Sequence, residues 1–276
     1  MKNICASCRS IDVIKIVKTD NNKIPKWLSK VNYVDNFINN VPLKLYKQKK
    51  TNMKLKLNVG KQNKNKYMLY WAAKSSKNIL IKDAKKAYGN FSNYGVSKVD
   101  NNGDVMLCFD CPQPYSTIEK GKTNKETFYR HIHFCFSNKF LTNWLSSVYT
   151  KIIMCELNLE ETMKLHNKGL IVLINALPGS YYSKSHIPNS YNLHNKEIRK
   201  MSQNELFNWF EEVIKLNYPV LYDYIKKKKL NLYEIPIVVY CAHKNCNAGY
   251  LSGIELLKKG FVNVSDFKGG MLEYLK

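Results

Sequence analysis

Two cysteines five residues apart are the side chains best placed in this sequence to do chemistry. Cys241 follows the apolar, β-branched run Ile235–Tyr240, which predicts a buried strand, and Cys246 precedes a predicted helix over Ala248–Lys259. A thiol between a strand and a helix faces backbone N–H groups and the positive end of the helix dipole, which favour the reactive thiolate. The sequence therefore predicts a reactive thiol at Cys241. The alternative is a buried, inert cysteine at a strand end.

The same loop contains His243 and Lys244, which add hydrogen-bond donors and positive charge. We expect both side chains to stabilise an anionic sulfur adduct on Cys241. Cys246 would resolve such an adduct or form a disulfide with Cys241, provided that their Cα atoms come within ~7 Å. These four residues are the predicted catalytic set, and a thiol reaction of this kind requires no cofactor.

The chain around this loop resembles a known family. The sequence VVYCAHKNCNAGYLSGIELLKKGFVNVSDFKGGMLEYL is similar to the active-site half of a rhodanese-like domain, and GLIVLINALPGSYYSKSHIPNSYNL is similar to the family's first strand and His-Ile-Pro turn. The resemblance covers roughly residues 156–276. It implies an α/β fold around a parallel sheet and a sulfurtransferase that carries a persulfide on Cys241, with a sulfane-sulfur donor and a thiol acceptor as partners. The second cysteine followed by Asn-Ala resembles a two-cysteine subgroup of the family.

The chain departs from the family pattern at positions that would bind an anionic donor. Asn175 and Leu177 stand where the family usually has Asp and Arg, Tyr274 stands where a Trp is common, and the loop holds no Arg. The alternative function is therefore a catalytically reduced, rhodanese-like binding or structural protein.

Size and composition favour a folded protein of two domains. A chain of 276 residues with 45% hydrophobic and 12% aromatic residues is long and apolar enough for two cores. No apolar run approaches the ~18–20 residues that span a bilayer, and charges interrupt the N-terminal stretch, so we expect no secretory signal and no membrane partner. The expected location is intracellular, in the cytoplasm or, for a viral protein, in the virion. Reduced cysteines are expected there.

Positive charge is concentrated in the first half of the chain. Residues 1–150 contain 27 Lys and Arg against 9 Asp and Glu, whereas residues 151–276 contain 17 against 12. The basic half predicts an acidic partner or nucleic acid. The alternative is genome composition, because Lys, Asn, Ile and Tyr are all abundant, as AT-rich coding in a large DNA virus or a protozoan dictates.

We divide the chain into a basic N-terminal segment (1–53), a β-sandwich (54–152) and a rhodanese-like domain (153–276). Alternating or apolar runs predict strands at 54–59, 67–73 and 129–135. The Asn-Gly turn at Asn102-Gly103 predicts a hairpin over 95–109. Apolar spacing predicts helices over 81–87 and 140–153, and a capping box with Ser202 and Glu205 predicts one over 202–216.

The His-x-His pair His131 and His133 is a second candidate for chemistry. Residues two apart on a strand point to the same face, so both imidazoles would lie on one side of the sheet, with Cys135 next in the row. Two such histidines form a two-point metal site, to which Tyr115 could add a phenolate. The alternative is a pair of surface histidines.

The wider pattern resembles the catalytic domain of intradiol ring-cleaving dioxygenases, a prealbumin-like β-sandwich. It consists of Trp71, the turn at Asp100–Gly103, Pro112-x-Pro-Tyr115 and His131-Ile-His133-Phe134. The resemblance implies iron, with zinc as the alternative, held by Tyr115, His131 and His133, and a non-haem iron oxygenase as a third function. The family's fourth ligand, a Tyr near position 78, is missing. Tyr88 or Tyr94 could replace it.

Two Cys-x-x-Cys pairs also have metal-ligand spacing. Cys5 and Cys8 could bind a structural zinc ion together with Cys108 and Cys111. The pairs lie about a hundred residues apart, farther than in compact zinc modules, so the alternative is four ordinary thiols.

Overall fold

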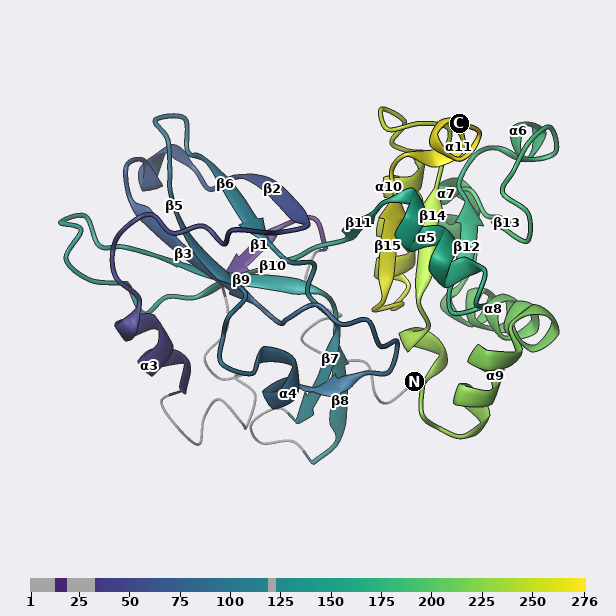
Figure 1. The fold of residues 1–276 in the computed structure, drawn as a ribbon, viewed down its shortest axis with the longest axis horizontal. Helices are drawn as coiled ribbons and strands as arrows, with labels where there is room; N and C mark the ends of the chain where they lie inside the picture. Colours follow the sequence, from purple (N-terminus) through teal and green to yellow (C-terminus); the bar gives the residue numbers. More distant parts are fainter. Residues whose placement is uncertain (1–12, 19–32, 119–122) are drawn as a thin grey trace. The chain divides into compact units, whose positions relative to one another are not determined.

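The computed structural model describes residues 13–18, 33–118 and 123–276, and the chain divides into two compact units (Figure 1). The N-terminal unit comprises the chain up to Lys77 together with Lys82–Ile153, and the C-terminal unit comprises Asn78–Ile81 and Met154–Lys276. None of the helices in the described ranges is long and apolar enough to cross a membrane.

The largest sheet of the N-terminal unit has five antiparallel strands in the order β1-β10-β9-β3-β5. In β3, Met68, Leu69, Tyr70 and Trp71 are all buried, as the apolar run predicted. The strands are β1 (Ile16–Lys18), β3 (Tyr67–Ala72), β5 (Tyr94–Lys98), β9 (His131–Phe136) and β10 (Tyr149–Ile152).

Two smaller sheets complete this unit. One pairs β2 (Met53–Asn58) with β6 (Asp104–Phe109), and the other has the order β4-β7-β8. In β2, Met53 and Leu57 are buried while Lys54 and Lys56 are exposed, the alternation of a half-buried strand. The remaining elements are β4 (Lys82–Asp83), β7 (Tyr115–Ile118), β8 (Lys125–Phe128), α3 (Tyr33–Asn40), α4 (Ala84–Tyr88) and the short helix η2 (Lys61–Asn63).

Tyr70 connects the five-stranded sheet to the β2–β6 pair. Its buried hydroxyl accepts a hydrogen bond from the Cys108 N–H and donates one to the Cys108 carbonyl, both at 3.1 Å. Its ring packs edge-on against Phe109 at a centroid distance of 6.4 Å. One tyrosine thus satisfies two backbone groups of a neighbouring sheet and fills the space between the sheets. The prealbumin-like sandwich itself stays a prediction.

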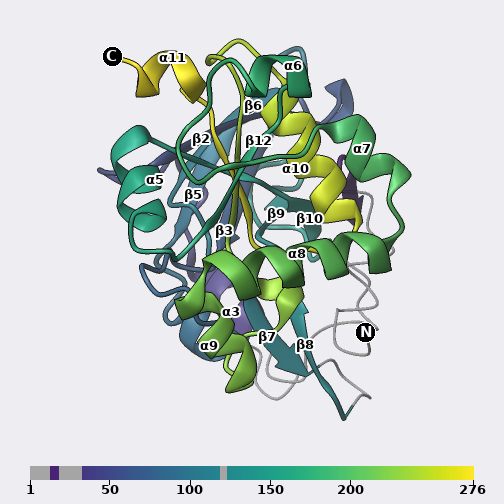
Figure 2. The same ribbon diagram turned by 90° about the vertical axis from the view of Figure 1, so that its right-hand side faces the viewer.

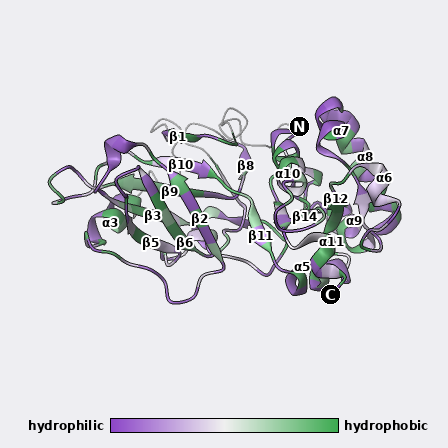
Figure 3. Cartoon of the chain, turned by 90° about the horizontal axis from the view of Figure 1, so that it is seen from above, coloured by the Kyte–Doolittle hydropathy of each residue, from purple (hydrophilic) through white to green (hydrophobic). Residues whose placement is uncertain are grey.

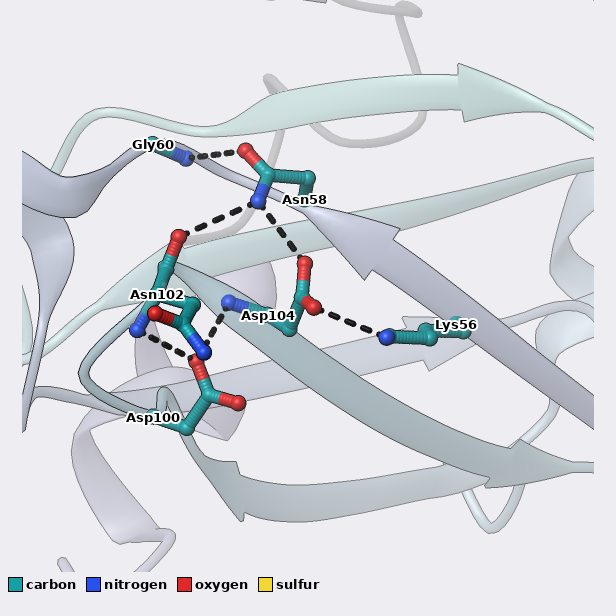
Figure 4. A network of polar contacts seen from close by, with 6 residues as sticks. All are labelled: Lys56, Asn58, Gly60, Asp100, Asn102 and Asp104. Atoms are coloured by element: carbon teal, nitrogen blue, oxygen red, sulfur yellow. Dashed lines mark hydrogen bonds and ion pairs between the residues drawn. The ribbon is translucent and has the colours of Figure 1, made fainter.

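The predicted hairpin over 95–109 is wrong in its pairing. β5 pairs with β3 and β6 pairs with β2, so the Asn-Gly turn links strands of different sheets. The turn is held by side chains (Figure 4): the Asp100 carboxylate accepts the N–H groups of Asn102 and Asp104, both at 2.8 Å. Asp104 also accepts a hydrogen bond from Asn58 on β2 at 2.7 Å, which fixes β6 beside β2.

The helix predicted over 140–153 is also wrong. This stretch is irregular up to β10. Of the apolar residues that suggested a buried helical face, Leu141 and Leu145 are exposed and only Trp144 is buried. Trp144 donates its indole N–H to the Val41 carbonyl at 2.7 Å. Contacts with distant parts of the chain therefore determine the structure here, and they override the local spacing.

The C-terminal unit is built on a parallel sheet in the order β11-β15-β14-β12-β13. Every residue of β12, β14 and β15 is buried, as expected for strands covered on both faces. The strands are β11 (Cys155–Leu157), β12 (Val172–Asn175), β13 (Tyr191–Asn192), β14 (Ile237–Tyr240) and β15 (Val264–Phe267).

Helices cover both faces of this sheet (Figure 2). On one face, α5 and α11 pack on Leu173, Val238, Tyr240 and Phe267. On the other, α10 packs so closely that a Cβ on Gly253 would lie 3.4 Å from the Val239 side chain. In Figure 3, β12 is drawn mainly in the hydrophobic colour. The helices are α5 (Leu159–His166), α6 (Gly179–Tyr182), α7 (Asn195–Lys200), α8 (Gln203–Asn217), α9 (Pro219–Lys226), η3 (Leu232–Glu234), α10 (Ala248–Lys258) and α11 (Gly270–Tyr274).

Local signals predicted two of these helices, α8 and α10. Ser202 caps α8 by accepting the Glu205 N–H at 3.2 Å, and Glu205 returns the bond to the Ser202 N–H, a complete capping box. Asn158 and Glu161 form the same motif at the start of α5. The predicted helix after the cysteine loop is confirmed as α10.

The final helix is anchored on the cysteine loop. The N–H groups of Met271 and Leu272 donate to the carbonyls of Cys241 and Ala242, both at 2.9 Å. Gly270 makes this approach possible: its φ is +61°, and a Cβ there would lie 2.3 Å from the Cys241 carbonyl oxygen.

We predict that Gly270→Ala destabilises the C-terminal unit much more than Gly169→Ala. Gly169 has the same left-handed backbone, φ +63°, but a methyl group added there would meet nothing within 4 Å. It should lose about 1 kcal/mol from conformation alone, whereas Gly270→Ala adds a backbone clash and should lose about 3 kcal/mol or more. Equilibrium urea unfolding measures both values. Equal losses would mean that the loop and α11 are not tightly joined.

Candidate functional site

Cys241 lies at the carboxyl end of β14, beside the first turn of α10. Its side chain is 2% exposed. Asn247 occupies the N-cap position of α10 without a side-chain capping bond, which leaves the N–H groups of the first turn free for the sulfur. Backbone hydrogen bonds from Gly249 and His243 to the sulfur lower the pKa of Cys241, as expected for a thiol at a helix N-terminus.

Burial has a larger effect on the pKa of Cys241 than these hydrogen-bond donors have. Desolvation, with a smaller contribution from the neighbouring Cys246 thiol, raises the pKa of Cys241 to about 12. The thiol is placed to donate to the carbonyls of Cys246, at 3.2 Å, and His243, at 3.8 Å. Desolvation therefore favours the neutral thiol at rest over the thiolate that the loop geometry predicts.

The structure brings only part of the predicted catalytic set together. Cys246 is half-buried, and its side chain is hydrogen-bonded with the Cys241 thiol. The side chains of His243 and Lys244 are exposed, and neither makes a hydrogen bond to the sulfur. Their catalytic roles stay predictions.

Neutral polar groups lie at the end of β14 on the sheet face opposite α10. The Tyr240 hydroxyl accepts the Ile187 N–H at 3.0 Å and shares a hydrogen bond with Ser190 Oγ at 2.7 Å. Asn175, opposite Tyr240 on β12, is fully buried and accepts the Leu177 N–H at 2.9 Å. The position where an Asp was expected thus carries an uncharged amide that orders the chain after β12.

One buried acid lies next to the site. Asp266 on β15 is 6% exposed, and desolvation, aided by the negative charge of Glu156, raises its pKa to about 7. The sequence carried no signal for it, because its role depends on strand register and helix packing.

The N-terminal unit contains a second buried cluster, in which four side chains converge: Tyr88, Tyr115, His131 and His133, hereafter the Tyr–His quartet. His131 Nε2 lies 3.0 Å from the Tyr115 hydroxyl, 3.3 Å from the Tyr88 hydroxyl and 3.1 Å from His133 Nε2. The sequence predicted three members. Of the two substitutes for the fourth, Tyr88 joins the quartet, whereas Tyr94 stacks on Tyr46 at 4.7 Å.

The outer hydrogen bonds of the histidines determine which ring nitrogen faces the centre. His131 Nδ1 lies 2.7 Å from the Tyr129 carbonyl, which can only accept, so Nδ1 carries the proton and Nε2 presents its lone pair inward. His133 Nδ1 lies 2.8 Å from Thr150 Oγ1. Burial lowers the pKa of His131 to about 4 and lowers that of His133 as well, so both rings are neutral near pH 7.

Three groups of the quartet approach the single inward lone pair of His131. One ring nitrogen accepts one good hydrogen bond, whereas a cation at the centre would bind all four donor atoms at once. The described ranges hold no group of three or more His, Cys, Asp or Glu side chains that could bind a metal, so a metal here requires the tyrosines.

The predicted zinc site is not supported. Cys5 and Cys8 lie outside the described residues, Cys108 is a buried free thiol, and Cys111 is disulfide-bonded and so cannot act as a thiolate ligand.

Comparison with known proteins places the C-terminal unit in a family. Residues 158–276 match the rhodanese-like domain, so this part of the chain is a rhodanese-like domain with a parallel sheet. No curated protein is significantly similar to the chain.

Two solved structures that are similar to part of this chain are sulfurtransferases. The human single-domain sulfurtransferase TSTD1 is 16% identical, over 44% of this chain and 94% of its own, with a TM-score of 0.30. The single-domain sulfurtransferase RDL2 of Saccharomyces cerevisiae is 11% identical, over 45% of this chain and 89% of its own, with a TM-score of 0.32. An uncharacterised protein from the same yeast is 21% identical, over 44% and 91%, with a TM-score of 0.30.

We predict that alkylation of Cys241 by iodoacetamide accelerates about tenfold per pH unit from pH 7 to pH 10, without a plateau. Only the thiolate reacts, and a thiol with a pKa near 12 stays mostly protonated over this range. A short, fully solvated cysteine peptide, with a pKa of about 8.5, levels off above pH 9. Peptide mapping by mass spectrometry measures the rate at Cys241. A plateau below pH 9 would contradict a neutral resting thiol.

Proposed function

We propose that the C-terminal unit is a sulfurtransferase that carries sulfane sulfur as a persulfide on Cys241. The main support for this proposal is the position of the thiol. It lies at the end of the central strand β14, within hydrogen-bonding distance of backbone groups at the start of α10. The rhodanese-like domain match supports the same class of reaction. In the proposed step, the Cys241 sulfur attacks the outer sulfur of a donor, and the electron pair of the broken S–S bond leaves with the rest of the donor.

Cys246 is the proposed resolving thiol. Its side chain lies in the same loop and is hydrogen-bonded with the Cys241 thiol. Attack of Cys246 on the inner sulfur of the persulfide would form a Cys241–Cys246 disulfide and release the outer sulfur as hydrosulfide. Attack by an external thiol on the outer sulfur would instead transfer it and regenerate Cys241. The donor, the acceptor and an acidic partner for the basic half of the chain stay predictions.

Sulfur loading tests this proposal directly. After incubation with a sulfane-sulfur donor, the wild-type chain should gain one sulfur, about 32 mass units in intact mass, as a covalent intermediate. Cys241→Ser should gain none, and Cys246→Ser should keep the gain for longer because its resolving thiol is absent. Cys108→Ser, which removes a buried thiol of the N-terminal unit, is the matched control and should load normally. Loading that survives in Cys241→Ser would refute the assignment.

The N-terminal unit has a separate proposed role as a metal-binding domain. We infer that the Tyr–His quartet holds a metal ion, supported by the convergence of four donor atoms and by outer hydrogen bonds that orient both imidazoles. Two phenolates and two neutral imidazoles suit a hard trivalent ion such as ferric iron, which would supply Lewis acidity when bound. The quartet residues provide the donors, and Tyr129 and Thr150 fix the ring orientations. The oxygenase activity implied by the sequence resemblance stays a prediction.

Metal titration checks this role. The purified chain should bind one ferric ion and develop visible absorption, because a phenolate bound to ferric iron absorbs visible light. Tyr88→Phe and Tyr115→Phe should each weaken binding by at least about tenfold and reduce the absorption. Tyr94→Phe changes a tyrosine outside the quartet, and this control should bind normally. A colourless protein without stoichiometric iron would remove this proposal.

A further inference from the structure

The Asp266 carboxyl lies beside the helix turn that contacts the Cys241 sulfur. Asp266 Oδ1 is 2.8 Å from the position that a Cβ on Gly249 would occupy, and Gly249 is the α10 residue whose backbone reaches the sulfur. Asp266 is opposite Val239 on the parallel strand β14. Cys241, two residues after Val239, therefore projects to the same face of the sheet as Asp266. The carboxyl and the thiol share one turn of α10.

Within the described ranges, no cation forms an ion pair or a hydrogen bond with this carboxyl. Glu156, its neighbour across the β11–β15 pairing, is also acidic. Lys268, the nearby cation, is bound to Glu156 at 2.7 Å. No hydrogen bond is made to the Asp266 carboxyl from the described parts of the chain. Its pKa is raised first by desolvation and then by Glu156, and the charge of Lys268 lowers it by less. Above neutral pH the site therefore has a buried negative charge beneath it.

The immediate surroundings of the sulfur also disfavour negative charge. The carbonyl oxygens of Cys246 and His243 face the thiol at 3.2 Å and 3.8 Å. The basic side chains of His243 and Lys244 are exposed, where water and salt screen them. The backbone of Gly249 and His243 also donates hydrogen bonds to the sulfur. Because the sulfur is surrounded by both acceptors and donors, the site favours a reacting group that carries little negative charge.

We propose that Asp266 is a specificity-determining residue of the sulfur-transfer site, which selects persulfide donors over dianionic donors such as thiosulfate. This inference rests on the proposed function of Cys241. With a persulfide, which is ionised at pH 8, Cys241–S⁻ and R–S–S⁻ give Cys241–S–S⁻ and R–S⁻. With thiosulfate, Cys241–S⁻ and S–SO₃²⁻ give Cys241–S–S⁻ and SO₃²⁻. The second donor brings two negative charges to the site instead of one and releases a dianion, so the Asp266 charge opposes it more strongly.

Coulomb's law indicates the size of the effect. For a carboxylate that shares one helix turn with the reacting sulfur, an additional unit charge on the donor, at an effective dielectric constant of about 20, changes a rate by at least about tenfold. Removing the carboxylate charge should therefore relax donor discrimination by about this factor.

The experiment compares two donors at pH 8, thiosulfate and hydroxyethyl persulfide, whose hydroxyethyl group is uncharged. Intact mass spectrometry follows sulfur loading of the full chain as wild type, Asp266→Asn, Asp266→Ser and Glu160→Gln. The control residue Glu160 is exposed on α5, on the sheet face opposite α10. Two substitutions at position 266 keep the test informative if one variant fails to fold.

We expect the persulfide-to-thiosulfate rate ratio to fall about tenfold in Asp266→Asn and Asp266→Ser, mainly because thiosulfate reacts faster, and to stay unchanged in Glu160→Gln. A simple packing role for Asp266 would slow both donors alike and leave the ratio constant, which would overturn the inference. An equal ratio in wild type and in the Asp266 variants has the same consequence. Absence of loading from both donors in the wild type would instead overturn the proposed function of Cys241 itself.

Discussion

The hydrogen bonds between the cysteine loop and α11 are the constraint on which the candidate site depends. Met271 and Leu272 bind the carbonyls of Cys241 and Ala242, and this close approach requires the left-handed, side-chain-free backbone at Gly270. Once the start of the loop is fixed in this way, the sulfur must lie between the end of β14 and the first turn of α10. Its burial, its contact with Cys246 and its proximity to Asp266 all follow from that position.

Burial and reactivity oppose each other at Cys241. The start of α10 supplies hydrogen-bond donors that favour a thiolate. Desolvation of the sulfur raises the pKa of Cys241 by more than these donors lower it, which favours the neutral thiol at rest. A neutral buried thiol is protected from oxidation and non-specific alkylation, because both reactions need an accessible thiolate.

Local sequence signals predicted what local interactions determine. The capping box at Ser202, the strand–loop–helix at Cys241 and the shared face of His131 and His133 all depend on residues a few positions apart. Prediction from the sequence was wrong where contacts between distant parts of the chain determine the structure. β10 pairs with β9 and β1, although residues 140–153 have helical spacing, and this error concealed Thr150 beside His133. The raised pKa values of Cys241 and Asp266 likewise arise from desolvation by elements that no local pattern brings together.

The Tyr–His quartet draws its members from three separate parts of the N-terminal unit. Tyr88 ends α4, Tyr115 begins β7 in the three-stranded sheet, and the histidines lie on β9 in the five-stranded sheet. An ion held by all four would act as a cross-link between the two sheets, and it would stabilise the folded form by mass action because the unfolded chain cannot assemble the site. Metal supply would thereby control the folding cooperativity and cellular lifetime of this unit, independently of any reaction at the ion.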